Sequence, residues 1–131
     1  MNERYTRQEA LLGKMGQEKL RDTTVFIAGA GGLGSPASLY LAAAGIGSIR
    51  ICDMDVIELS NMNRQILHTE ERLGTSKAES AKKTLESLNP ECSVTAFSER
   101  IDDSSVLRLI GDADIIVDCM DNFDARFILN K

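Results

Sequence analysis

A cluster of glycines directly after a short apolar run constrains the fold of this chain more than any other feature. Residues 29–34 read Gly-Ala-Gly-Gly-Leu-Gly and satisfy the spacing G-x-G-x-x-G. They follow residues 24–28 (TVFIA), a run with the length and composition of a buried parallel strand. A helix is predicted over residues 33–44, with Leu33, Ala37, Tyr40, Leu41 and Ala44 at helical spacing. A strand, a glycine turn and a helix in this order predict the start of a doubly wound α/β fold.

Strands and helices continue to alternate along the rest of the chain. Further strands are predicted at residues 48–53, 93–98 and 115–120. Helices are predicted from Ser76 to Asn89-Pro90, from an Asp103 cap to about Ile110, and from near Asn122 onward. Residues 54–75 form a long loop with one short helical turn. This alternation predicts right-handed crossovers and a Rossmann-like parallel sheet with strand order 3-2-1-4.

Length and charge limit the organisation and the function. The 131 residues suffice for one domain. We assign residues 1–22 to an N-terminal helical arm and residues 23–131 to the Rossmann-like domain. The net charge of −5 argues against general nucleic-acid binding, and no apolar stretch reaches the roughly 20 residues of a membrane span. The three cysteines form no C-x-x-C pair, so we expect no zinc site within this chain. Because no secretory signal is evident, we expect reduced thiols and a cytoplasmic location.

The glycine loop has the features of a nucleotide site. Gly29, Gly31, Gly32 and Gly34 would permit a tight turn and a close approach of backbone to phosphate, beside a helix N-terminus with unpaired N–H groups. Asp53 ends the second strand, about 20 residues on, where it could bind a ribose hydroxyl. NAD, FAD and ATP all use such a loop. A glycine-rich turn that binds nothing remains the alternative interpretation.

The polar residues after the second strand and at the next helix favour a ligand with several phosphates. Asn61, Arg64 and Gln65 lie in the long loop at the sheet edge where ligands bind, although such loops are often only solvated. Ser76 and Glu79 have capping-box spacing, which puts Lys77 at the first helical position. A cation there opposes the helix macrodipole at a cost of about 0.3–1 kcal/mol, which a phosphate would offset. An exposed lysine that tolerates this cost is the alternative.

Asp121, after the fourth strand, completes the set. If that strand lies beside the first, Asp121 faces the glycine loop and could hold Mg²⁺ against phosphates. It could equally cap the last helix. Two cations, a ribose carboxylate and a metal carboxylate suit a nucleoside triphosphate better than a nicotinamide dinucleotide. The only histidine, His68, follows two apolar residues and is interpreted as structural.

These motifs, taken in order, resemble the ThiF/MoeB/HesA family, the prokaryotic relatives of ubiquitin-activating enzymes. The resemblance covers nearly the whole chain. It rests on Arg4-Tyr5-x-Arg7-Gln8, the glycine loop, Asp53, Glu58-Leu-Ser-Asn61-x-Asn-Arg64-Gln65, Gly74-x-x-Lys77-Ala78, Asn89-Pro90 and Asp118-Cys-x-Asp121-Asn122.

The resemblance implies an ATP-dependent adenylyltransferase. Such an enzyme activates the C-terminal Gly-Gly carboxylate of a ubiquitin-like sulfur-carrier protein, as in thiamin or molybdopterin biosynthesis. Asp53 would then hold the ribose, and the glycine loop would approach the phosphates. Asn61, Arg64, Gln65 and Lys77 would contact the phosphate chain. Asp121 would coordinate Mg²⁺, and Arg7 would reach the phosphates of the other subunit of a homodimer, unless it is an ordinary surface arginine.

Family members are usually longer than this chain, and their second half carries the rest of the sheet and often a C-x-x-C zinc pair. We therefore expect a truncated form. Two other functions remain open: a non-catalytic module that binds nucleotide or dimerises, and an NAD(P)-linked oxidoreductase.

Overall fold

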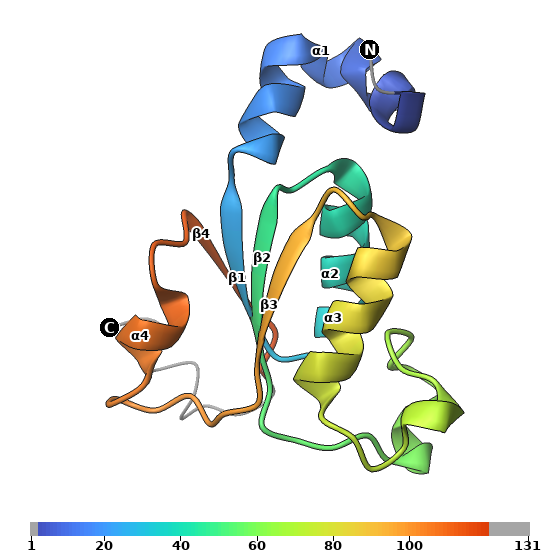
Figure 1. Ribbon diagram of the computed structural model, residues 1–131, viewed down its shortest axis with the longest axis vertical. Helices are drawn as coiled ribbons and strands as arrows, with labels where there is room; N and C mark the ends of the chain where they lie inside the picture. Colours follow the sequence, from blue (N-terminus) through green and yellow to red (C-terminus); the bar gives the residue numbers. More distant parts are fainter. Residues whose placement is uncertain (1–2, 121–131) are drawn as a thin grey trace.

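A four-stranded parallel sheet forms the centre of the fold in the computed structural model, which describes residues 3–120 (Figure 1). The strands are β1 (Thr24–Ala28), β2 (Ser48–Cys52), β3 (Ser93–Phe97) and β4 (Ile115–Asp118). Their order is β3-β2-β1-β4, and each neighbouring pair is parallel. The predicted α/β class and strand order 3-2-1-4 are confirmed.

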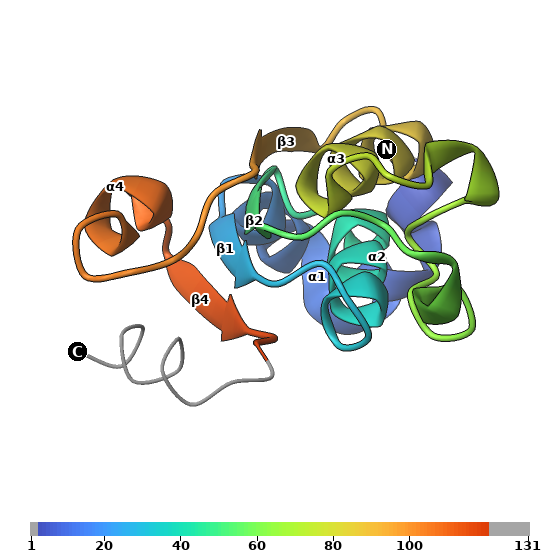
Figure 2. The ribbon, with the colours of Figure 1, turned by 90° about the horizontal axis from the view of Figure 1, so that it is seen from below.

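Helices cover both faces of this sheet. The α-helices are α1 (Thr6–Arg21), α2 (Gly34–Ala44), α3 (Lys77–Leu88) and α4 (Val106–Ile110), and the 3-10 turns are η1 (Glu3–Tyr5), η2 (Leu59–Asn61) and η3 (Glu70–Arg72). Figures 1 and 2 show α2 and α3 on one face and α4 on the other. No helix among residues 3–120 is both long and apolar enough to cross a membrane.

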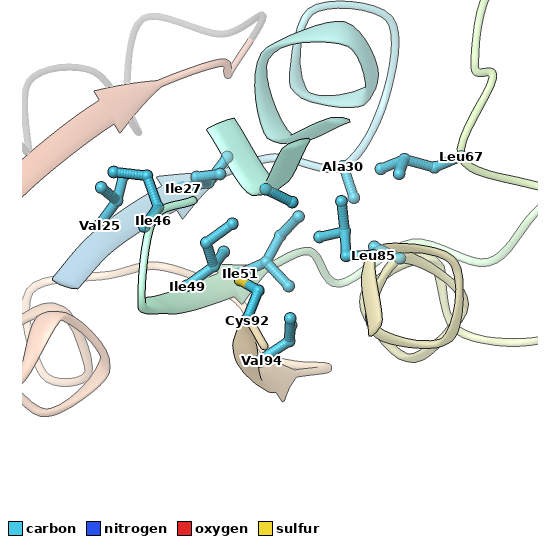
Figure 3. Close-up of a cluster of buried hydrophobic side chains, with 12 residues drawn as sticks. Val25, Ile27, Ala30, Ile46, Ile49, Ile51, Leu67, Leu85, Cys92 and Val94 are labelled. Carbon is cyan, nitrogen blue, oxygen red and sulfur yellow. The ribbon is translucent and has the colours of Figure 1, made fainter. Parts of the chain in front are cut away.

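The core follows from the alternation of side chains along the strands. Val25 and Ile27 of β1 and Ile49 and Ile51 of β2 lie in the cluster under α2 and α3 (Figure 3). On the opposite face, Phe26 and Ala28 pack with Val106 and Leu109 of α4. Both faces of β1 are therefore buried, which explains the unbroken apolar run in the sequence.

The helical arm lies beyond the edge at which β1 begins (Figure 1). It is kinked at Gly13, whose φ of 73° is a left-handed conformation that favours glycine. The Asn89 side chain donates to the Tyr5 hydroxyl over 2.8 Å, and the Gln17 side chain donates to the Ala44 carbonyl over 3.0 Å. The arm is thus tied to the helical layer at the edge opposite the glycine loop.

Several boundaries differ from the sequence-based expectations. The long loop contains two 3-10 turns rather than one helical turn. The predicted Asp103 cap is wrong, because Asp102 accepts the backbone N–H groups of Ser104 and Ser105 ahead of α4. A short polar run with adjacent aspartates does not reveal which of them folds back onto the backbone. The predicted last helix lies outside the described residues.

Candidate functional site

A pocket of about 740 Å³ lies at the edge of the sheet where β1, β2 and β4 end. It brings together the predicted residues Gly29, Gly31, Gly32, Asp53, Arg64, Gln65 and Lys77. The glycine loop after β1, the long segment between β2 and α3, and the segment between β3 and α4 leave the strands here, as expected for a ligand site in an open parallel sheet. The predicted residues Gly34, Asn61 and Arg7 do not line this pocket, and Asp121 lies outside the described residues.

Two of the loop glycines are required by close backbone contacts. Gly29 has a φ of 105°, and a Cβ atom there would lie 2.9 Å from the Cys119 carbonyl oxygen. A Cβ atom at Gly34 would lie 1.9 Å from the Gly29 carbonyl oxygen, which is a direct clash. Gly34 therefore allows α2 to begin directly against the loop, while Gly31 and Gly32 line the pocket.

Asp53 connects the glycine loop to the end of β2. Its Oδ2 accepts the N–H of Ala30 over 2.8 Å, and its Oδ1 accepts the N–H of Asp55 over 2.8 Å. A carboxylate has about four lone-pair sites, so these two bonds fix its orientation and leave capacity for hydroxyl donors of a ligand. In nucleotide-binding sheets of this topology, a carboxylate near this position commonly binds a ribose hydroxyl.

Lys77 is a buried cation at a helix N-terminus. Ser76 is the N-cap that the capping-box spacing predicts, since its hydroxyl accepts the N–H of Glu79 over 3.3 Å and α3 begins at Lys77. Lys77 is only 7% exposed and lines the pocket. The ion pairs among residues 3–120 join Arg4 to Glu91 and Arg108 to Glu99 and do not involve it. Burying a charge is costly unless it is paired, so among the described residues this position of Lys77 favours an anion in the pocket.

The loop after β2 presents Arg64 and Gln65 to the same space. The Asn61 carbonyl accepts the N–H groups of Arg64 and Gln65 over 3.2 and 3.0 Å, so the backbone of Asn61 shapes the turn that carries both side chains. Gln65 is 5% exposed, and its Oε1 has no hydrogen-bond partner within the described part of the chain. An unpaired buried acceptor costs about 1–3 kcal/mol, which a bound donor would relieve.

The pocket has further walls that the sequence analysis did not assign. Met54, Glu99, Arg100 and Ile101 line it from beyond β2 and β3, and Cys119 and Met120 line it from beyond β4. Met54 and Glu99 directly follow predicted strands, which was the available signal because parallel strands end at a common edge, whereas Cys119 and Met120 were predicted to lie within the fourth strand, which ends at Asp118. Burial raises the pKa of the Cys119 thiol, which disfavours the reactive thiolate.

Arg7 lies outside this pocket. It is an exposed residue of α1, in the arm at the opposite edge of the sheet (Figure 1). Within one chain, the described arrangement therefore does not bring Arg7 to the glycine loop. Its expected role across a subunit interface stays a prediction.

His68 is buried against the loop, and this burial predicts a pH effect on stability. Desolvation lowers the pKa of His68, with smaller contributions in the same direction from Lys77 and Arg72, although the Ala30 carbonyl and Asp53 oppose them. In the unfolded chain the histidine pKa is about 6.5, so as the pH falls the unfolded chain protonates this ring before the folded chain does.

We expect the free energy of unfolding to fall between about pH 7 and pH 5, above the range in which carboxylates titrate. Urea unfolding of the wild type and of His68→Gln across this range measures the effect. The variant should show the flatter profile, and equal slopes would contradict this interpretation.

Comparisons with known proteins agree with this geometry. The ThiF family model matches residues 5–131. The chain is 48% identical over 115 residues to a probable molybdopterin-synthase adenylyltransferase of Porphyra purpurea, covering 88% of this chain and 30% of that protein. It is 43% identical over 130 residues to the SAMP-activating enzyme E1 of Haloferax volcanii, covering 98% and 48%.

A solved structure with a bound nucleotide has the same fold. E. coli tRNA N6-threonylcarbamoyladenosine dehydratase, TcdA, in complex with ATP matches with a TM-score of 0.91 and 30% identity. The match covers 96% of this chain and 52% of that one. The chain thus spans less than half the length of the curated relatives described above.

Proposed function

The chain belongs to the ThiF family, and from that premise we propose that it is the nucleotide-binding part of an ATP-dependent adenylyltransferase. Its substrate would be the C-terminal Gly-Gly carboxylate of a ubiquitin-like sulfur-carrier protein. The observation that carries this proposal is Lys77, a buried cation that shares a pocket with the glycine loop and Asp53. The names of the relatives, which describe adenylyltransferase and SAMP-activating enzymes, support the reaction class.

In the proposed complex, the nucleotide extends along the pocket from β2 to the glycine loop. Asp53 binds the ribose, and the loop of Gly29, Gly31, Gly32 and Gly34 presents N–H groups to the phosphates. Arg64, Lys77 and the side-chain amide N–H of Gln65 contact the phosphate chain, while Asn61 holds the turn from which Arg64 and Gln65 project. Arg7 acts on the site of the second subunit in a homodimer.

The proposed residue set also suits a metal ion bound with the nucleotide. Mg²⁺ is usually held by one or two carboxylates together with substrate phosphates. Residues 3–120 contain no cluster of three metal-binding side chains, and this mode of binding requires none. Asp121 would hold the ion, which would neutralise charge on the triphosphate when bound.

The chemistry requires positioning rather than a general base. A terminal carboxylate has a pKa of about 3.5, so it is already ionised at neutral pH. One of its oxygens attacks the α-phosphorus, the bond from that phosphorus to the oxygen bridging to the β-phosphate breaks, and pyrophosphate leaves with the electron pair. Lys77 and Arg64 lower the repulsion between the anionic carboxylate and the triphosphate and stabilise the leaving pyrophosphate.

Pyrophosphate exchange tests this proposal. The protein is incubated with ATP, Mg²⁺, labelled pyrophosphate and, one at a time, the ubiquitin-like proteins ending in Gly-Gly that the same genome encodes. Label should enter ATP with one of these carriers and not with its variant lacking the last glycine. ATP binding without exchange with any carrier would instead indicate a non-catalytic nucleotide-binding module.

A further inference from the structure

Ala30, within the glycine loop, is held from two sides by residues outside the loop. Its N–H donates to Oδ2 of Asp53 over 2.8 Å, and its carbonyl oxygen accepts from Nε2 of His68 over 2.8 Å. Asp53 comes from the end of β2, and His68 from the segment between η2 and η3. The backbone conformation of the loop is therefore fixed by two side chains that are distant in sequence.

The His68 ring joins the loop to the helix that carries Lys77. The ring is 5% exposed and does not line the pocket. Because a carbonyl oxygen only accepts, Nε2 must carry the proton, and in the neutral ring Nδ1 is then an acceptor. Nδ1 lies 2.9 Å from the hydroxyl of Ser80, one turn after Lys77 in α3.

Arg72 determines the direction of this hydrogen bond. Its Nη1 donates to the Ser80 hydroxyl over 3.1 Å and to the Thr84 hydroxyl over 2.6 Å. Since the Ser80 oxygen accepts from Arg72, its own proton is available for Nδ1 of His68. A directed chain of hydrogen bonds thus runs from Arg72 through Ser80 and His68 to the carbonyl of Ala30.

We propose that His68 is a positioning residue for the triphosphate. It fixes the Ala30 peptide relative to Lys77, so that the loop N–H groups and the Lys77 ammonium contact the same phosphates. This inference rests on the proposed function, because it concerns how the same site binds ATP. His68 therefore affects the binding of the phosphates and not that of the nucleoside. Adenosine carries no phosphate and would bind through Asp53, whose second hydrogen bond, from the N–H of Asp55, does not involve the loop, so its affinity should depend little on the ring.

Two substitutions separate this role from simple packing. His68→Leu removes both hydrogen bonds and keeps an apolar side chain in the space, whereas His68→Gln keeps an N–H that can reach the Ala30 carbonyl. ATP and adenosine affinities of the full chain are measured by calorimetry, with a thermal melt for each variant. We expect His68→Leu to weaken ATP binding roughly tenfold and to leave adenosine affinity within about twofold of wild type. His68→Gln should recover most of the lost ATP affinity.

The outcomes distinguish this inference from the proposed function. Equal losses for ATP and adenosine, or no loss for ATP, would overturn the positioning role. Failure of the wild type to bind ATP would overturn the proposed function itself. Because the chain contains one histidine, its ¹⁵N ring signals are assigned without ambiguity. The Nε2–H tautomer is expected, and the Nδ1–H tautomer would contradict the hydrogen-bond direction even if both variants unfold.

Discussion

Replacing Lys77 with methionine is expected to lower the affinity for ATP roughly 100-fold while making the ligand-free chain more stable by about 1 kcal/mol. The two effects have one cause. Lys77 is buried at a helix N-terminus and forms none of the ion pairs present among residues 3–120. Methionine fills similar space without charge, so it removes the desolvation cost together with the contact to phosphate. Calorimetry with ATP and urea unfolding without it measure the two quantities.

Lys83→Met is the matched control for this prediction. Lys83 is an exposed lysine of the same helix and does not line the pocket. The control should leave ATP affinity and stability within about 0.5 kcal/mol of wild type. A Lys77→Met variant that binds ATP normally, or that is less stable than wild type without ligand, would contradict the assignment of Lys77 as a phosphate contact.

Replacing Gly34 with alanine should reduce both stability and ATP binding. The new Cβ atom would lie 1.9 Å from the Gly29 carbonyl oxygen and 2.8 Å from its carbon, so the start of α2 must move away from the loop. We expect a loss of about 3 kcal/mol in the free energy of unfolding, at the upper end of overpacking costs, and at least about tenfold weaker ATP binding. Urea unfolding and calorimetry measure these changes.

Gly32→Ala offers the contrasting case two residues away. Among the residues that the structure describes, a Cβ atom there would meet the Arg64 side chain alone, at 3.7 Å, which is an ordinary contact. Since Gly32 lines the pocket, this variant should weaken ATP binding while stability changes by less than about 1 kcal/mol. Equal stability losses in the two variants would contradict the assignment of the Gly34 loss to a clash with the Gly29 carbonyl oxygen.

The local motifs were sufficient to predict the strand order and to bring part of the candidate set, including Asp53 and Lys77, to one pocket, whereas Asn61 and Arg7 do not line it. The glycine loop, Asp53 and the Ser76 cap each depend on neighbouring residues, and a parallel sheet gathers the ends of its strands at one edge. Lys77 therefore lies at the predicted first helical position and in the same pocket as Asp53. Its burial was not predictable, because it depends on the long loop between β2 and α3.

The apolar spacing that predicted α2 does not mark its buried face. Leu33 and Tyr40, which lie at that spacing, are 59% and 77% exposed. The buried residues are small: Gly34, Ser35, Ser38 and Ala42. Close approach to β1 selects small side chains, and a helix that is apolar on several sides gives no periodic signal for its orientation.

The role of His68 was only partly accessible from the sequence. Its structural character followed from its apolar neighbours, and the ring is buried as expected. Its contact with Ala30 joins residues 38 positions apart. Such a pairing is created by tertiary packing, and no spacing rule along the chain would have identified it.

A calorimetric titration of the protein with ATP and Mg²⁺, beside a titration with NADH, decides whether the pocket at the carboxyl edge of the sheet binds a nucleoside triphosphate. We expect saturable ATP binding that is weakened by Lys77→Met, and no comparable binding of NADH. Tight NADH binding together with no ATP binding would contradict the proposed nucleotide site and favour an oxidoreductase.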